Sequence, residues 1–200
     1  REPSALERER LEGFIGRLWD AGLEAGHSVR TVEACCETAR ADITVQTTLL
    51  DARYLTGSRP QFERLHAAVQ GQLDPIAFFE AKQLEQEQRH LKHQDSAYSL
   101  EPNLNEAPGG LRDLQTIKWI AGAIGIGAEW HDLERAGLIT GVEARRLARD
   151  EALLQQLRIR LHYLAGRRED RIVFDYQTVL AGEMGYAGSA ARRAGEQLMQ

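Results

Sequence analysis

The chain has 200 residues, of which 42% are hydrophobic and 28% are charged, and its formal net charge is −5. A domain usually has about 100 to 150 residues, so this length predicts one large or two small globular domains. The composition excludes a disordered protein, the acidic balance argues against a nucleic-acid coat, and no apolar run nears the roughly 18 residues of a membrane span.

The first segment is predicted to be an amphipathic helix. Ser4 and Glu7 have the spacing of a capping box, and apolar residues then recur with helical period. Gly26 is expected to end this helix. Residues 27–31 are too few and too polar for another helix, so we predict a strand there.

A short helix over 32–41, capped by Thr31, is expected next. Residues 43–55 carry two signals. Asp42 could cap a helical turn, but alternating apolar residues favour a strand in the second half of the segment. The beginning of the chain therefore has the pattern of an α/β domain.

Beyond residue 57 the pattern is helical, because β-branched residues become sparse and apolar residues recur at helical spacing. The stretch 96–110, with two prolines and two glycines, is expected to be an ordered loop. Helices are predicted over 62–70, 75–93, 111–123, around Leu133, and over 142–164 and 176–184. The predicted fold class is mainly α, a helical bundle preceded by a smaller α/β part.

The strongest local signal for chemistry is the paired glycines that open the helix at 111. Free backbone N–H groups at a helix start attract anions, and Gly109 and Gly110 would let a phosphate approach the backbone. Arg112 could add two parallel hydrogen bonds to phosphate oxygens. The plainer alternative is a Pro-Gly-Gly turn in which Arg112 and Asp113 are paired structurally.

A second candidate cluster lies at 27–30. On a strand, Ser28 and Arg30 would project to one face beside His27, and Arg30 could hold a triphosphate. An arginine paired with a surface carboxylate is the plainer alternative. Asp42 and Asp51 are candidate Mg²⁺ ligands, although a helix cap or a surface charge explains each of them better.

A polar stripe at helical spacing contains Gln86, Arg89, His90 and His93. The two histidines could bind a metal, but a solvated helix face explains the stripe better, because no third ligand has a useful spacing. The only cysteines, Cys35 and Cys36, are adjacent and are read as reduced cytosolic thiols.

Several strings in order along the chain resemble the bacterial PII uridylyltransferase/uridylyl-removing enzymes. Among them are His27-Ser-Val-Arg-Thr31, Leu100-Glu-Pro-Asn103 and Gly109-Gly-Leu-Arg-Asp113. The other matching segments are 18–26, 42–45, 50–57, 88–90 and 168–175. The resemblance covers nearly the whole chain, and the ordered set is far more specific than any single string.

The resemblance implies a fold and a reaction. Residues 1–60 would be the C-terminal α/β part of a polymerase-β-like nucleotidyltransferase domain, and residues 61–200 the helical domain behind it. The family transfers UMP from UTP to a tyrosine of the PII signalling protein, with Mg²⁺, in the cytoplasm. The family's Asp-x-Asp metal pair does not occur in these 200 residues, nor do its phosphohydrolase and ACT domains, so the chain is expected to be an internal fragment that is inactive alone.

The resemblance also implies roles for particular residues. His27, Ser28 and Arg30 would border the nucleotide cleft, and Asp51 would be a third carboxylate near the metal. Gly109, Gly110, Arg112 and Asp113 would close the cleft from the helical side. Asn105 stands where the family usually has lysine, which removes a possible phosphate contact.

Two alternatives remain open. The helices could be a docking module for PII or for neighbouring domains, without contact to a nucleotide. The Gly-Gly-Leu-Arg-Asp element is also similar to one in the glutamine synthetase adenylyltransferases, although the strings at 27–31 and 100–103 favour the uridylyltransferases.

Overall fold

The computed structural model describes residues 4–23, 26–93, 99–188 and 193–199. It divides into two compact units, Arg1–Leu73 and Asp74–Gln200. The boundary between the two units thus lies just after the helix Arg59–Gln72. The domain boundary predicted after residue 60 lies instead in the first turn of that helix. The predicted division into family domains stays a prediction.

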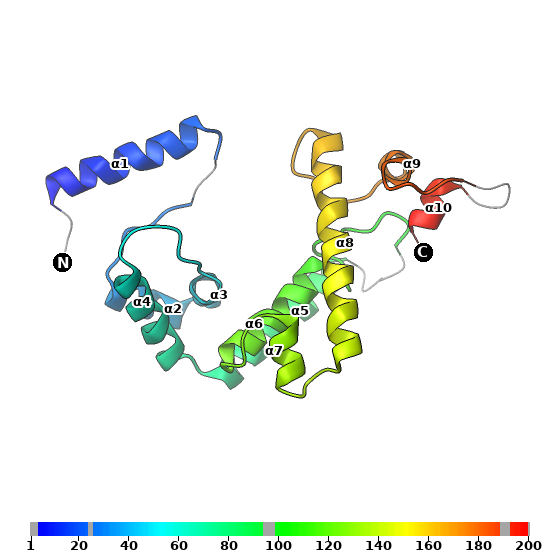
Figure 1. Ribbon diagram of the computed structural model, residues 1–200. Coiled ribbons are helices and arrows are strands. Elements are labelled where there is room, and N and C mark those ends of the chain that lie inside the picture. The colour runs from blue at the N-terminus through cyan, green and yellow to red at the C-terminus, as the bar shows by residue number, and fades with distance from the viewer. Residues whose placement is uncertain (1–3, 24–25, 94–98, 189–192, 200) are drawn as a thin grey trace. The chain divides into compact units, whose positions relative to one another are not determined.

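The first unit contains four helices in its described residues (Figure 1). Helix α1, Ala5–Asp20, begins with the predicted capping box, in which Ser4 and Glu7 bond reciprocally. It ends earlier than predicted, because the backbone leaves the helix at Ala21 and turns through Gly22, whose φ is +76°. Gly26 is therefore not the stop.

Helices α2 (Val32–Ala41), α3 (Ile43–Leu50) and α4 (Arg59–Gln72) pack on one another. Thr31 caps α2 as predicted, because its Oγ1 accepts from the Ala34 N–H at 3.2 Å. The Gln72 amide donates to the Cys36 carbonyl at 2.9 Å and so ties α4 to α2. Cys35 and Cys36 are both free thiols, as expected.

The predicted strands at 27–31 and in the second half of 43–55 are wrong. Residues 27–31 are extended but pair with no strand among the described residues, and 43–50 is helical because Asp42 caps it. A strand is stable only when a neighbour takes up its backbone hydrogen bonds, and in the described chain the one bridge joins Asn103 and Arg171. The described residues therefore contain no strand of the predicted α/β part. The predicted mainly α character of the chain is confirmed.

The second unit begins with α5, Pro75–Lys92, which packs on α6, Leu111–Ala123. Helix α7, Trp130–Arg135, and the long α8, Gly141–Ala165, follow, and α8 contacts α6, α7 and α9 (Figure 1). Helix α9 spans Phe174–Glu183, and the short α10, Ala194–Leu198, which the sequence did not predict, packs on it. The other predicted helices are confirmed to within a few residues.

Two apolar clusters hold the second unit together, and Leu154 of α8 packs against both. One cluster contains Leu104, Leu157, Leu161, Ile172 and Leu180, and the other contains Leu114, Ala121, Trp130, Leu133 and Ala144. Burying each leucine or isoleucine side chain stabilises the fold by about 1.5–3 kcal/mol, before the cost of ordering it, and each alanine contributes less. The long α8 therefore serves as the common wall of both clusters.

A half-buried carboxylate reinforces this wall. Glu151 of α8 accepts from the Lys118 ammonium at 2.8 Å and from the Trp130 indole at 2.7 Å, so it joins α6 and α7 to α8. Its exposed fraction is only 12%, which weakens screening by water. No helix in the described parts of the chain combines the length and the apolar character needed to cross a membrane.

The segment 99–110 is an irregular loop, as predicted, and residues 96–98 of the predicted loop lie outside the described residues. Its first half is bonded to the segment after α8: the Leu104 N–H donates to the Asp170 carbonyl at 2.8 Å, and the Ile172 N–H donates to the Pro102 carbonyl at 3.0 Å. The Asp170 carboxylate in turn accepts from Arg158 at 2.6 Å. The loop is therefore fixed on α8 before it reaches α6.

Candidate functional site

The glycine pair before α6 is required by the backbone itself. Gly109 has φ +79°, a conformation that side chains with a Cβ disfavour. At Gly110, a Cβ would lie 2.9 Å from each of three backbone carbonyl oxygens, those of Leu104, Asn105 and Ala107. The loop folds back onto the start of the helix so closely that only glycine fits there.

The backbone N–H groups at this helix start are already used. The Leu111 and Arg112 N–H groups donate to the carbonyls of Leu104 and Asn105, both at 2.9 Å. The Gly110 N–H donates to the Ala107 carbonyl at 2.8 Å, and the Gly109 N–H donates to the Asp113 carboxylate at 2.8 Å. The prediction that these donors are free for a phosphate is therefore wrong, because the preceding loop occupies them.

Asp113 is the meeting point of this region. Besides the Gly109 N–H, its carboxylate accepts from Gln86 Nε2 at 2.8 Å and from the Arg89 guanidinium, and His90 Nε2 lies 3.0 Å from both oxygens. We expected the polar stripe on α5 to be a solvated face. This expectation is wrong, because three of its side chains turn toward α6. The plainer interpretation of Asp113 as a structurally paired residue is confirmed.

These partners keep Asp113 ionised. Burial by itself would raise the pKa of this carboxyl, but hydrogen bonds from Gln86, the Gly109 N–H and His90, together with the charge of Arg89, lower it below its ordinary value. An ionised carboxylate with all these donors is suited to holding α5, α6 and the loop together. It is not suited to giving up a proton at neutral pH.

Arg112 is a predicted site residue of this unit whose side chain a ligand can reach. Its side chain is 34% exposed, and its guanidinium lies 5.5 Å from the centre of the Trp119 ring. Nη1 donates to Gln115 at 3.2 Å, whereas Nη2 lies 3.5 Å from Glu106, the limit of a hydrogen bond. The guanidinium is oriented by a ring and an amide but has no tight ion pair with a carboxylate.

Two neighbours of Arg112 were not predicted as site residues. Asn105 is buried, and its Nδ2 donates to Glu106 Oε1 at 2.5 Å. The other Glu106 oxygen lies 3.9 Å from Nε of Arg89. The Asn103 side chain accepts from the Asn105 N–H at 3.0 Å and from the Glu106 N–H at 2.7 Å. This is a local turn of a kind that the sequence can suggest. Nothing in the sequence places Glu106 between two arginines.

The remaining predicted site residues belong to the first unit. His27, Ser28 and Arg30 are exposed in the extended segment before α2. Arg30 lines a hollow of about 680 Å³ whose walls also include Arg10 and Arg64. A nucleotide contact for these three residues stays a prediction.

The two aspartates predicted as metal ligands lie at the ends of α3. Asp42 caps the helix, because its Oδ1 accepts from the Thr44 N–H at 2.7 Å; this bond and one from the Val45 N–H lower the pKa of Asp42. Asp51 is exposed at the other end. Within the described residues, no three His, Cys, Asp or Glu side chains gather to hold a metal ion. Asp42 and Asp51, at opposite ends of α3, are thus not brought into one carboxylate cluster, and a Mg²⁺ contact for either stays a prediction.

Replacing Gly110 by alanine is expected to destabilise the second unit by about 1–3 kcal/mol, because the added methyl meets three backbone oxygens that cannot move independently. Gly122→Ala, in the same helix, is the matched control. A Cβ there has no neighbour within 4 Å, and alanine should stabilise the helix by up to about 1 kcal/mol. Urea unfolding of both variants measures the difference, and equal stabilities would contradict the close-packed turn.

Asp113→Asn should lower the free energy of unfolding by about 3 kcal/mol at pH 7, because it leaves the half-buried Arg89 without its close carboxylate partner. The folded-state pKa of Asp113 is lowered, so the native state holds fewer protons than the unfolded state, and the stabilisation is lost as the pH falls through that pKa.

The gap between parent and variant should therefore be constant above about pH 5 and narrow below about pH 4. Chemical denaturation across this pH range measures it. Asp150→Asn, which removes an exposed carboxylate from α8, should give no such pH-dependent gap. A gap for Asp113→Asn that is the same at every pH would show that its charge does not stabilise the fold.

Comparison with known proteins identifies the family. Residues 77–200 match the profile of the family described as GlnD PII-uridylyltransferase. The chain is 57% identical over 199 residues to the bifunctional uridylyltransferase/uridylyl-removing enzyme of Cupriavidus pinatubonensis, a match that covers 100% of the chain and 23% of that protein. No solved structure was found to match.

Two further relatives carry the same name. The protein of Bordetella parapertussis is 54% identical over 198 residues, covering 99% of the chain and 23% of the relative. The protein of Burkholderia mallei is 57% identical over 192 residues, covering 96% of the chain and 22% of the relative. The chain thus spans less than a quarter of the length of these curated relatives, and it belongs to the GlnD PII-uridylyltransferase family.

Proposed function

We propose that the chain is the part of a PII uridylyltransferase that supplies the helical wall of the nucleotide cleft. The observation that carries this proposal is Arg112, a half-exposed guanidinium oriented by Trp119 and Gln115 on a helix start that the loop and Asp113 hold rigid. A planar guanidinium is suited to bidentate bonds with phosphate oxygens. The name uridylyltransferase carried by the relatives supports UTP as the nucleotide, and the description of the family supports PII as the acceptor.

In the proposed reaction, a tyrosine hydroxyl of PII attacks the α-phosphorus of UTP. The new bond joins the tyrosine oxygen to phosphorus, the bond between the α-phosphorus and the bridging oxygen breaks, pyrophosphate leaves, and the hydroxyl proton passes to a base. Catalysis of this kind rests mainly on positioning and on neutralising phosphate charge. The part of Arg112 would be to bind and orient the phosphates.

The metal and the other activities belong to the proposal for the whole enzyme. Because the described residues form no carboxylate cluster, we place most ligands of the required Mg²⁺ outside the described residues. The removal of uridylyl groups, which the names of the relatives include, is likewise assigned to a phosphohydrolase domain, and glutamine sensing to ACT domains. The enzyme is proposed to act in the cytoplasm.

The 200-residue chain by itself should not uridylylate PII, because it holds neither an Asp-x-Asp pair nor a metal cluster in its described residues. Incubating the purified chain with PII, labelled UTP and Mg²⁺, beside the full-length enzyme as a positive control, measures this. Transfer of label by the chain at a rate near that of the full-length enzyme would refute it.

In the full-length enzyme, Arg112→Ala should lower kcat/KM for UTP by about 10- to 100-fold, which corresponds to the loss of one charge-assisted hydrogen bond of about 1.5–3 kcal/mol. Its thermal unfolding should change little, because Arg112 is half-exposed and has no tight ion pair. Arg146→Ala, which removes an exposed arginine from α8, is the control.

Unchanged UTP kinetics in Arg112→Ala would refute the phosphate contact. If the variant used UTP normally but bound PII more weakly, the helices would act as a docking module instead. Measuring PII affinity and UTP kinetics on the same preparation separates the two functions.

A further inference from the structure

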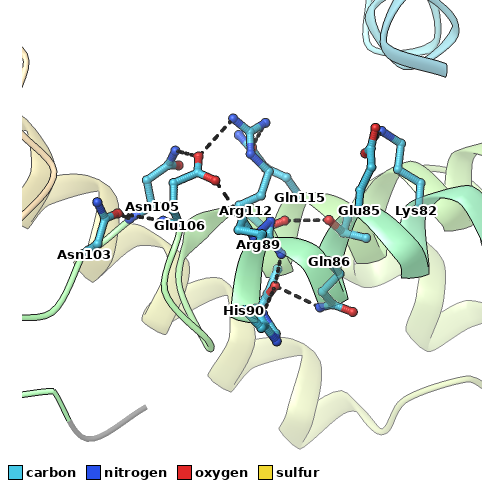
Figure 2. Close-up of polar contacts among 12 residues, drawn as sticks. Lys82, Glu85, Gln86, Arg89, His90, Asn103, Asn105, Glu106, Arg112 and Gln115 are labelled. Atoms are coloured by element: carbon cyan, nitrogen blue, oxygen red, sulfur yellow. Dashed lines mark hydrogen bonds and ion pairs between the residues drawn. The ribbon is translucent and has the colours of Figure 1, made fainter. Parts of the chain in front are cut away.

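Three hydrogen-bond donors converge on the carboxylate of Glu106 (Figure 2). Asn105 Nδ2 lies 2.5 Å from Oε1, Arg112 Nη2 lies 3.5 Å from the same oxygen, and Arg89 Nε lies 3.9 Å from Oε2. The donors come from α5, from the loop and from α6. An arrangement of two guanidinium groups and one amide around a single anionic group is the arrangement that binds a phosphate.

Glu106 fills this position poorly. Nε of Arg89 is buried and has no hydrogen-bond partner, although its Nη2 is bound to Asp113. The contact with Arg112 is also at the limit of hydrogen-bond length. A buried donor left without an acceptor destabilises the fold. An anion with more oxygens than a carboxylate could satisfy both arginines better.

The Arg112 guanidinium can turn toward such an anion without breaking a tight ion pair. It shares the Trp119 ring with the ammonium of Lys82, which lies 5.0 Å from the ring centre. The Lys82 side chain is 96% buried and is neutralised by Glu85 at 2.7 Å, so it fixes the ring and leaves Arg112 as the outer cation. Glu106 is 32% exposed and can rotate into solvent.

We propose that Glu106 is an internal counter-ion in a phosphate site formed by Asn105, Arg112 and Arg89, and that a phosphate group of the ligand displaces it. Once Glu106 has moved away, Arg89 keeps its pair with Asp113, whereas Arg112 has no other carboxylate partner in the described structure, which leaves one positive charge uncompensated. The ligand class is a phosphate or diphosphate. The inference rests on the proposed function in taking this phosphate to belong to a nucleotide.

Titration of the 200-residue chain with pyrophosphate, at ionic strength kept constant with chloride, tests the proposal. The readout is the indole N–H signal of Trp119 in a ¹⁵N NMR spectrum, because Arg112 lies against that ring. The indole of Trp130, bonded to Glu151, is an internal reference in the same unit. The signals are assigned with Trp119→Phe.

Glu106→Gln should bind pyrophosphate about fivefold more tightly than the parent, the effect expected when one competing carboxylate of about 1 kcal/mol is removed. Glu183→Gln removes the same charge from α9, where the carboxylate pairs with Arg160, and should bind like the parent. Arg112→Gln in the Glu106→Gln background should abolish the shift of Trp119. Glu106→Ala repeats the test without any acceptor at this position.

Equal or weaker binding by both Glu106 variants, with thermal unfolding like that of the parent, would overturn the proposal, and so would the absence of a Trp119 shift in every protein. These outcomes are separate from the test of the proposed function. Pyrophosphate binding that depends on Glu106 and Arg112, with normal UTP kinetics of Arg112→Ala in the full-length enzyme, would keep the anion site and refute the nucleotide role.

Discussion

The proposed site of the second unit depends on the hydrogen bonds that the Asp113 carboxylate accepts. It takes donors from α5 and from the loop before α6, and the half-buried Arg89 has no other carboxylate within 3.5 Å in the described structure. Because Asp113 lies in the first turn of α6, fixing it also fixes the direction in which Arg112 leaves the helix. The accessible cation is thus positioned by a neighbour that a ligand need not touch.

The same loop that brings Glu106 to the arginines also closes the helix start. Its carbonyls accept from the first N–H groups of α6, and its glycines allow that close approach. Recognition of an anion here must therefore use side chains, unlike the glycine-rich loops in which backbone N–H groups cradle a phosphate. A side-chain site can be adjusted by a single competing carboxylate, which is the part we propose for Glu106.

Local rules predicted much of the fold. Capping by Ser4 and Thr31, and the helix over 111–123, follow from interactions within about four residues, which the sequence displays directly. The strands predicted near 27–31 and after residue 48 failed because pairing depends on a distant neighbour, and the cap at Asp42 outweighed the alternating pattern.

The sequence by itself determined that the chain is mainly helical, which family it resembles, and that Gly109, Gly110, Arg112 and Asp113 form one local motif. Only the tertiary structure decided what that motif does. The partners of Asp113 lie 23 to 27 residues earlier in the chain, and a separation of that size carries no periodic signal. Folding brings them together because one buried carboxylate needs several donors, and this need turns a stripe expected to face water into an internal contact.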